Sequence, residues 1–167
     1  MTESVLWSVA GGQWRTHAEQ SAAARSLLAE MLGEAAVVVH DDRGVPRLPQ
    51  HPELNISISH CRTAVAVAIS RIGAVGIDIE SRRRIDPSLV TRICTPDERD
   101  AVDRSDDPTM AFLDLWTKKE AVLKCRGTGI RGFDSMVHAL AQPGVKVQAL
   151  PCRLPDTVAA LATATDE

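Results

Sequence analysis

The stretch from Leu54 to Glu80, LNISISHCRTAVAVAISRIGAVGIDIE, decides the fold class. It holds three short segments rich in β-branched residues, LNISISH, AVAVAIS and AVGIDIE, which the tripeptides CRT and RIG separate. Segments of this composition are typical of strands, and connections this short join antiparallel neighbours. The stretch therefore predicts a three-stranded antiparallel meander.

The sequence before this stretch predicts a strand, a helix and a second strand. SVLWSV and AAVVVH have the composition of strands, whereas residues 17–32 are rich in alanine and leucine and favour a helix that Gly33 ends. After the stretch, Thr95 to Glu98 combines an N-cap, a first-turn proline and the glutamate of a capping box. Asp107 and Pro108 then open a longer helix that runs to about Arg126.

Three closing segments, FDSMVHAL, VKVQAL and TVAALATA, are predicted to be strands. The order of the elements favours the α+β class over a doubly wound parallel sheet. At 167 residues we expect one domain, spanning 1–167, that buries roughly 70% of the surface of its unfolded chain.

Composition and charge exclude several classes of protein. A net charge of −3 argues against a general nucleic-acid-binding protein, which would show a basic excess. The four cysteines lack the C-x-x-C pairing of a zinc or redox site, so reduced thiols are expected. No window is apolar enough to span a membrane, and the N-terminal residues lack the pattern of a signal peptide. We therefore expect a cytoplasmic protein without nucleic-acid or membrane partners.

Two acids lie on one face of the predicted strand VGIDIE. The period of two places Asp78 and Glu80 together and turns Ile77 and Ile79 to the other face. Two neighbouring carboxylates repel each other unless solvent or a cation neutralises them. Two interpretations stay open here: a solvent-facing strand whose acids meet Lys or Arg, and a Mg²⁺ site.

The helix in WTKKEAVLKCRGTGI, from Trp116 to Ile130, adds a carboxylate and several ammonium groups. Glu120 and Lys124 share a face at the i and i+4 spacing. Alone, such a pair is usually a surface ion pair that stabilises its helix by about 0.2–0.5 kcal/mol, and a run of lysines is usually a solvated face. The combination with Asp78 and Glu80, and with the glycines that follow, favours a functional site.

These segments resemble the signatures of a known family. VGIDIE and WTKKEAVLK are similar to the motifs G-[IV]-D-x-E and W-x-x-K-E-A-x-x-K of the 4′-phosphopantetheinyl transferases, and RGVPRLP…LNISISH resembles the segment GKP…FNISHS of their larger, Sfp-like branch. The resemblance runs from about Ala22 to Gly132. It implies a monomeric pseudo-dimer of two similar halves, about 1–80 and 81–167, each an antiparallel sheet packed with a long helix.

The resemblance also implies the reaction and its residues. The expected reaction moves the phosphopantetheine arm of coenzyme A to a serine of an acyl or peptidyl carrier protein, with Mg²⁺ or Mn²⁺ as cofactor, and releases adenosine 3′,5′-bisphosphate. Glu120 and Lys124 would be catalytic. The metal would be held by Asp78, Glu80 and Glu120. Coenzyme A would be bound by Arg25, Arg47, Ser59, His60, Asp78, Lys119 and Lys124.

The chain differs from that branch in three places. The branch has a longer segment with basic residues ahead of its first helix, where this chain offers Arg15, His17 and Arg25. Cys61 stands where Ser or Thr is common, and Val45 replaces the lysine of GKP. Because carriers of this class are acidic around their serine, we expect a basic docking surface. Its expected residues are Lys118, Arg126 and Arg131.

Two other functions are alternatives for this sequence. A metal-dependent nuclease of the D…E-x-K type places its Glu and Lys at i and i+2 on a strand, whereas Glu120 and Lys124 need a helix. A family member that binds coenzyme A or a carrier without efficient transfer is the other alternative. The sequence does not identify the carrier or its pathway.

Overall fold

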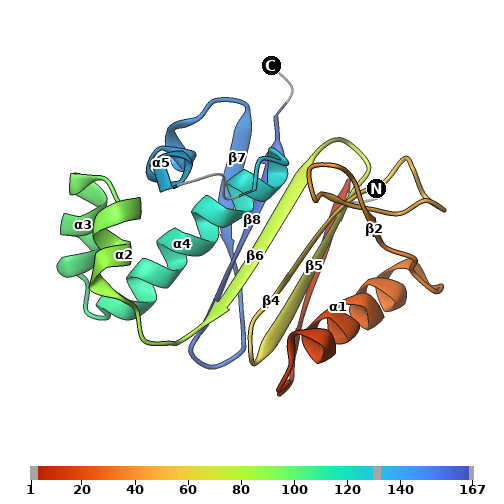
Figure 1. Cartoon of the computed structure of the whole chain (residues 1–167), viewed down its shortest axis with the longest axis horizontal. Coiled ribbons are helices and arrows are strands. Elements are labelled where there is room, and N and C mark those ends of the chain that lie inside the picture. The colour runs from red at the N-terminus through yellow and green to blue at the C-terminus, as the bar shows by residue number, and fades with distance from the viewer. Residues whose placement is uncertain (1–3, 130–132, 166–167) are drawn as a thin grey trace.

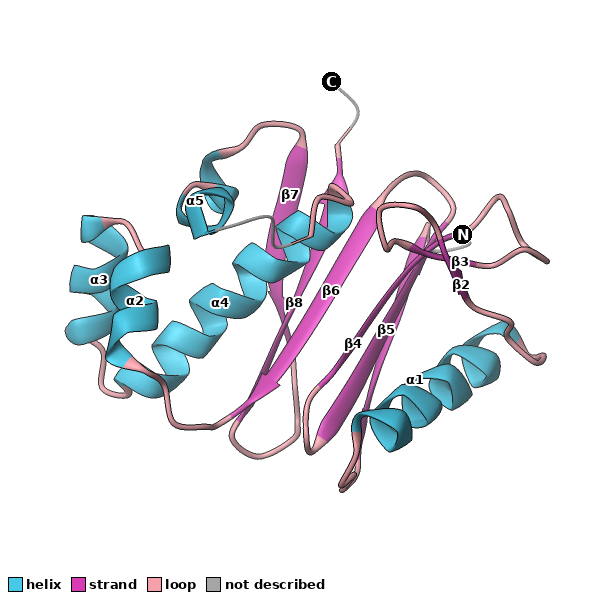
Figure 2. Cartoon of the chain, viewed as in Figure 1, coloured by secondary structure: helices cyan, strands magenta, loops and turns pink. Residues whose placement is uncertain are grey.

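The computed structural model describes residues 4–129 and 133–165 and contains two three-stranded antiparallel sheets, each covered by one long helix (Figures 1 and 2). The first sheet has the strand order β1-β5-β4 and packs against helix α1. A short hairpin of two strands, β2 and β3, follows α1. These elements are β1 (Val5–Gly11), α1 (His17–Leu32), β2 (Val39–His40), β3 (Pro46–Arg47), β4 (Asn55–His60) and β5 (Ala64–Ser70).

The second sheet has the order β6-β8-β7, and helix α4 crosses its face (Figure 1). Shorter helices pack around α4 on the side away from the first sheet. The elements are β6 (Val75–Ser81), α2 (Pro87–Ile93), α3 (Pro96–Asp103), α4 (Pro108–Cys125), α5 (Phe133–Val137), the 3-10 helix η1 (Ala139–Ala141), β7 (Val145–Leu150) and β8 (Thr157–Ala164). The predicted mixture of helices with antiparallel sheets is confirmed.

The predicted three-stranded meander is only partly correct. β4 and β5 pair antiparallel, but β6 pairs with β8 along its whole length. β6 meets the first sheet through a side chain, since the Ile77 amide donates a hydrogen bond to Ser57 Oγ at 3.0 Å. β6 therefore belongs to the second sheet. The division into halves of about 1–80 and 81–167 and their two-fold relation stay predictions.

Capping signals in the sequence correctly predicted ends of three helices, α1, α3 and α4. α1 spans the predicted 17–32 and ends at Gly33, whose φ of 76° is the left-handed conformation that favours glycine. α3 begins at the predicted capping box, in which Thr95 and Glu98 exchange hydrogen bonds. α4 begins at the N-cap Asp107. These boundaries follow from local backbone hydrogen bonding, which is why the sequence predicts them.

Two predicted strands are wrong or shorter than expected. FDSMVHAL forms α5 and η1, because Met136 and Ala139, three residues apart, are both fully buried against the α4 core, and that spacing needs a helical backbone. In AAVVVH only Val39 and His40 form a strand. No helix in the described part of the chain is both long enough and apolar enough to cross a bilayer.

The two faces of β5 pack into two different hydrophobic clusters. Its large residues, Val65, Val67 and Ile69, pack with α1. Its alanines are fully buried against the second sheet and belong to one cluster with the β6 residues Val75, Ile77 and Ile79; they are Ala64, Ala66 and Ala68. Alternation of large and small residues thus replaces the usual alternation of apolar and polar residues, because both faces of this strand are buried.

Candidate active site

Gly76 brings the two sequence motifs into backbone contact. A Cβ atom at this position would overlap the Ala121 carbonyl oxygen and lie 2.5 Å from the Cys125 amide nitrogen. Only glycine lets α4 approach β6 this closely. The side chain of Asp78 points to the same face two residues further on, so it emerges beside the last turns of α4.

The carboxylate of Asp78 joins the two sheets and α4. Its Oδ1 accepts hydrogen bonds from Lys124 Nζ at 2.6 Å and from Ser59 Oγ at 2.7 Å. Lys124 Nζ also donates to the Ile77 carbonyl at 3.1 Å. Asp78 is buried, and its Oδ2 has no hydrogen-bond partner in the described part of the chain. A buried carboxylate oxygen without a partner is costly, which indicates that another group completes this site.

Glu120 and Glu80 add negative charge next to Asp78. Glu120 is buried, and its burial raises the pKa of its carboxyl to about 7, with further contributions from the charges of Asp78 and Glu80 and an opposing one from Lys124. Glu80 accepts hydrogen bonds from Arg83 at 3.1 and 3.2 Å. Among the described residues, the ion pairs of these three carboxylates are those of Asp78 with Lys124 and of Glu80 with Arg83.

The donor set fits a hard divalent cation in its chemistry. Carboxylate oxygens are the ligands that Mg²⁺ takes, and the unpartnered Asp78 Oδ2 together with the raised pKa of Glu120 indicates a site short of positive charge. In the part of the chain that the structure describes, no three His, Cys, Asp or Glu side chains are already gathered as a metal cluster. The ligand set of Asp78, Glu80 and Glu120 therefore stays a prediction.

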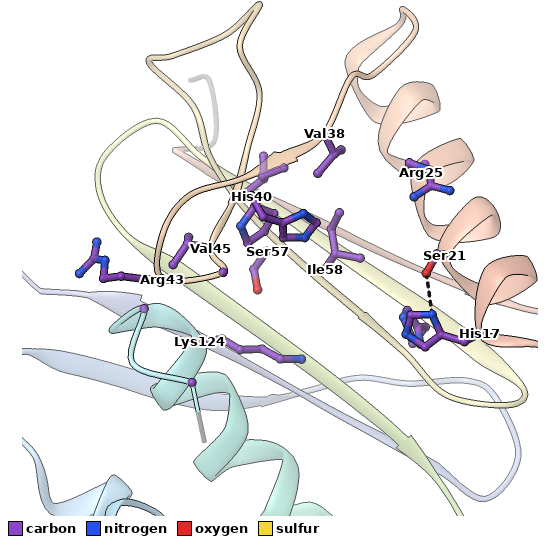
Figure 3. Close-up of a pocket in the computed structure, with 16 residues that line it drawn as sticks. His17, Ser21, Arg25, Val38, His40, Arg43, Val45, Ser57, Ile58 and Lys124 are labelled. Carbon is purple, nitrogen blue, oxygen red and sulfur yellow. Dashed lines mark hydrogen bonds between the residues drawn. The ribbon is translucent and has the colours of Figure 1, made fainter. Parts of the chain in front are cut away.

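A cavity of about 340 Å³ lies beside Lys124 (Figure 3). Figure 3 shows His17, Ser21 and Arg25 of α1 on one side of it and Lys124 of α4 on the other. Its remaining described lining residues are Val38, His40, Arg43, Gly44, Val45, Pro46, Ile56, Ser57, Ile58, His60, Gly127 and Gly129. None of the described residues that line it is acidic, although the whole chain carries a net charge of −3. The cavity is therefore suited to an anion.

Two histidines meet at the edge of this cavity. The rings of His17 and His60 pack edge to face, with centroids 4.7 Å apart. Burial lowers the pKa of His60, and the charges of His17 and Lys124 lower it further. An anion bound beside the pair would favour the protonated ring and raise this pKa. The sequence predicted a role for His60 and offered His17 as a basic residue near the first helix, but Ser21 and His40 were not predicted.

Some predicted ligands lie elsewhere. Lys119 is fully buried, and its ammonium group contacts Glu98 at 2.7 Å and the carbonyls of Ile93 and Val137 at 2.8 and 3.0 Å. Its three donors are used in fixing α4 to its neighbours, so the structure does not bring Lys119 to the cavity.

Two further predicted coenzyme A ligands, Ser59 and Arg47, also have protein partners. Ser59 is buried and donates a hydrogen bond to Asp78. Arg47 forms an ion pair with Asp41. Neither residue lines the cavity.

Two of the three predicted docking residues, Lys118 and Arg126, have local partners. Lys118 forms an ion pair with Asp114 at 2.5 Å. Arg126 donates a hydrogen bond to the Pro143 carbonyl. Arg131 lies outside the described residues. The structure thus leaves the docking surface untested.

The raised pKa of Glu120 predicts how stability depends on pH. Because the folded-state pKa is about 7 and the ordinary value is 4.5, the folded protein binds more protons between these values, and the free energy of unfolding falls as pH rises. In EDTA, E120Q should remove up to about 3 kcal/mol of that fall between pH 5 and pH 8. Urea unfolding across this range measures it. Equal pH dependence in wild type and E120Q would show that Glu120 is not the group responsible.

Comparison with known proteins finds a matching family model and several curated relatives. The family model described as the 4′-phosphopantetheinyl transferase superfamily matches residues 74–152. A 4′-phosphopantetheinyl transferase AcpT of Escherichia coli is 31% identical over 129 residues, which cover 72% of this chain and 66% of the relative. The 4′-phosphopantetheinyl transferase psf-1 of Bacillus pumilus is 31% identical over 121 residues, which cover 71% of this chain and 52% of the relative.

A third relative, AcpT of Salmonella typhimurium, is 32% identical over 109 residues, which cover 63% of this chain and 57% of the relative. The chain thus matches between about half and two thirds of the length of these curated relatives. The match to the family model includes both Gly76 and the turns of α4 that pack on it. This chain belongs to the 4′-phosphopantetheinyl transferase superfamily.

Proposed function

We propose that this protein transfers the 4′-phosphopantetheine arm of coenzyme A to a serine of an acyl or peptidyl carrier protein. The observation that carries the proposal is the cavity without acidic lining that ends at Lys124, whose ammonium group also contacts the buried Asp78. Family membership and the names of the curated relatives support the reaction class. We further propose that the two sheet–helix units are related by a pseudo-twofold axis, so that one chain forms the whole site.

The chemistry uses the charges already described. The serine oxygen forms a bond to the phosphorus that carries pantetheine, and the bond from that phosphorus to the oxygen of adenosine 3′,5′-bisphosphate breaks. Glu120, with a pKa of about 7, is suited to accept the serine proton near neutral pH. Lys124 stabilises the negative charge that develops on the leaving group.

A divalent metal is the cofactor that we propose, Mg²⁺ or Mn²⁺. Asp78, Glu80 and Glu120 would hold it, and when bound it would neutralise charge on the diphosphate. The chain's own residues position the reactants: α1 and β4 bind the nucleotide half of coenzyme A, and the close contact of α4 with β6 fixes Glu120 and Lys124 next to Asp78.

Intact-protein mass spectrometry tests the proposal directly. A panel of apo carriers from fatty-acid, polyketide and nonribosomal-peptide systems is incubated with the protein, coenzyme A and MgCl₂. We expect at least one carrier to gain the mass of the phosphopantetheine arm, and K124M to abolish the gain. If coenzyme A binds and every carrier stays unmodified, the chain is a binding member of the family and the proposed activity is wrong.

Binding of coenzyme A should depend on the basic side of the cavity. H60A and R25A should each weaken coenzyme A binding by about tenfold, which is the loss expected for one charge-assisted contact to a phosphate. Both should weaken binding of 3′-dephospho-coenzyme A less. Calorimetry measures both ligands. Arg71 is an exposed residue that does not line this cavity, so R71A serves as the control. Equal losses for the two ligands would remove His60 and Arg25 from the 3′-phosphate site.

Docking of an acidic carrier should depend on salt and on basic rim charges. Reversing Lys118 and Arg131 to glutamate should raise the apparent KM for the carrier about tenfold at low salt, because rim charges mainly steer association. The KM for coenzyme A should change little. Steady-state kinetics at two salt concentrations measures both. Unchanged carrier kinetics would show that Lys118 and Arg131 are not part of the docking surface. The next candidate residues are then Arg82, Arg83 and Arg84, beyond the end of β6.

A further inference from the structure

Glu80 is held by the guanidinium group of Arg83 with both of its carboxylate oxygens. Arg83 Nε contacts Glu80 Oε2 at 3.2 Å, and Arg83 Nη2 contacts Glu80 Oε1 at 3.1 Å. This two-point geometry is the strongest that an arginine makes with a carboxylate. The Glu80 side chain is only 19% exposed, so solvent screens the pair less than it screens a fully exposed one.

The two other acids of the site have no comparable arrangement. Asp78 gives one oxygen to Lys124 and Ser59 and leaves Oδ2 without a partner in the described part of the chain. Glu120 has its pKa raised, first by burial and then by the charges of Asp78 and Glu80. An oxygen is therefore available at Asp78, whereas both oxygens of Glu80 are occupied by Arg83.

We propose that Arg83 competes with the divalent cation for Glu80, so that Glu80 can bind the cation only when the Arg83–Glu80 ion pair opens. The inference rests on the proposed metal ligands. Without the cation, Arg83 offsets the repulsion among the three carboxylates. When the cation binds, it takes over that role, and the exposed guanidinium group returns to solvent. Arg83 thereby lowers the affinity of the empty protein for Mg²⁺ and makes the metal site depend on the strength of one ion pair.

Arg84 provides a matched control. It is the next residue, it is exposed, and no ion pair holds it in the part of the chain that the structure describes. R83Q and R84Q remove the same charge from neighbouring positions, so any general electrostatic effect on cation binding should be similar in both. Only R83Q frees the carboxylate of Glu80.

Titration of the coenzyme-A-free protein with MgCl₂ by calorimetry tests the proposal. R83Q should bind Mg²⁺ about three- to tenfold more tightly than R84Q, the range expected from a half-buried ion pair with two hydrogen bonds. In EDTA, R83Q should unfold at a lower temperature than R84Q, and saturating MgCl₂ should remove that difference. Equal Mg²⁺ affinities for the two variants, or no Mg²⁺ binding by either, would overturn the proposal.

These outcomes are separable from those of the proposed function. If R83Q and R84Q show the predicted difference in Mg²⁺ affinity but the protein modifies no carrier, the proposed competition is supported and the proposed transferase activity is wrong. If the protein modifies carriers but R83Q and R84Q bind Mg²⁺ with equal affinity, the proposed transferase activity is supported and the proposed competition is wrong.

Discussion

We expect G76A to lose several kcal/mol of folding free energy, on the order of 3 kcal/mol or more, because the new methyl group meets backbone rather than a movable side chain. The added Cβ would overlap the Ala121 carbonyl oxygen and crowd the Cys125 amide. α4 would have to move off β6 to make room. Urea unfolding followed by circular dichroism measures the loss, and residual folded G76A should show reduced transfer because Glu120 and Lys124 move with α4.

G11A is the matched control for this substitution. Gly11 is also a strand glycine without a left-handed φ, and a Cβ there would meet Leu154 Cδ2 at 2.8 Å. That atom is the end of a flexible side chain, so a rotation of Leu154 relieves the contact. We expect G11A to cost less than about 1 kcal/mol. If G76A were as stable as G11A, close helix–strand contact would not be what requires glycine in the motif.

The second large effect is expected at Asp78. D78A and D78N should each lower the rate of carrier modification by about a thousandfold or more, because they remove a proposed metal ligand and the partner of Lys124. D78A should also destabilise the fold, since it leaves Lys124 and Ser59 without their shared acceptor. D78N keeps the shape of the side chain and is therefore the cleaner test.

Mass spectrometry of the carrier and urea unfolding measure these two effects separately. D106N, at an exposed acid in the loop before α4, controls for the loss of one negative charge. A folded D78N protein with near-normal turnover at limiting MgCl₂ would show that Asp78 does not hold the metal.

Local signals in the sequence predicted α1, α3 and α4, whereas α2 and α5 were not predicted as helices. Thr95 with Glu98, and Asp107 with Pro108, mark their helix starts through hydrogen bonds made within a few residues. The partner of β6 was missed because strand pairing depends on residues far away in the chain, here Thr157–Ala164. Alternation in VGIDIE correctly separated Asp78 from Ile77 but carried no information about which strand lies alongside.

The lysines of α4 show a second limit. At 3.6 residues per turn, Lys119 and Lys124 lie about 140° apart around the helix, so they face different neighbours. Lys124 faces the cavity, and Lys119 faces Glu98 and two carbonyl groups. Helical geometry is enough to place Lys119 and Lys124 on different faces of α4, but it does not show what Lys119 contacts. Its buried acceptors come from the α2–α3 junction and from the end of α5. No local pattern in the sequence indicates that these segments converge there.

The alanine face of β5 limits how the cavity responds to a ligand. Alanine has no side-chain rotamers, so the β5 side of the contact between the two sheets loses no side-chain entropy on packing and has no alternative rotamer to adopt. Ala64, Ala66 and Ala68 therefore let the β5 backbone lie close to the β6 side chains at the joint between the two units. Any widening of the space between α1 and α4 must then come from loop segments such as residues 41–45, and a single larger side chain at Ala66 would change the separation of the two units along the whole joint.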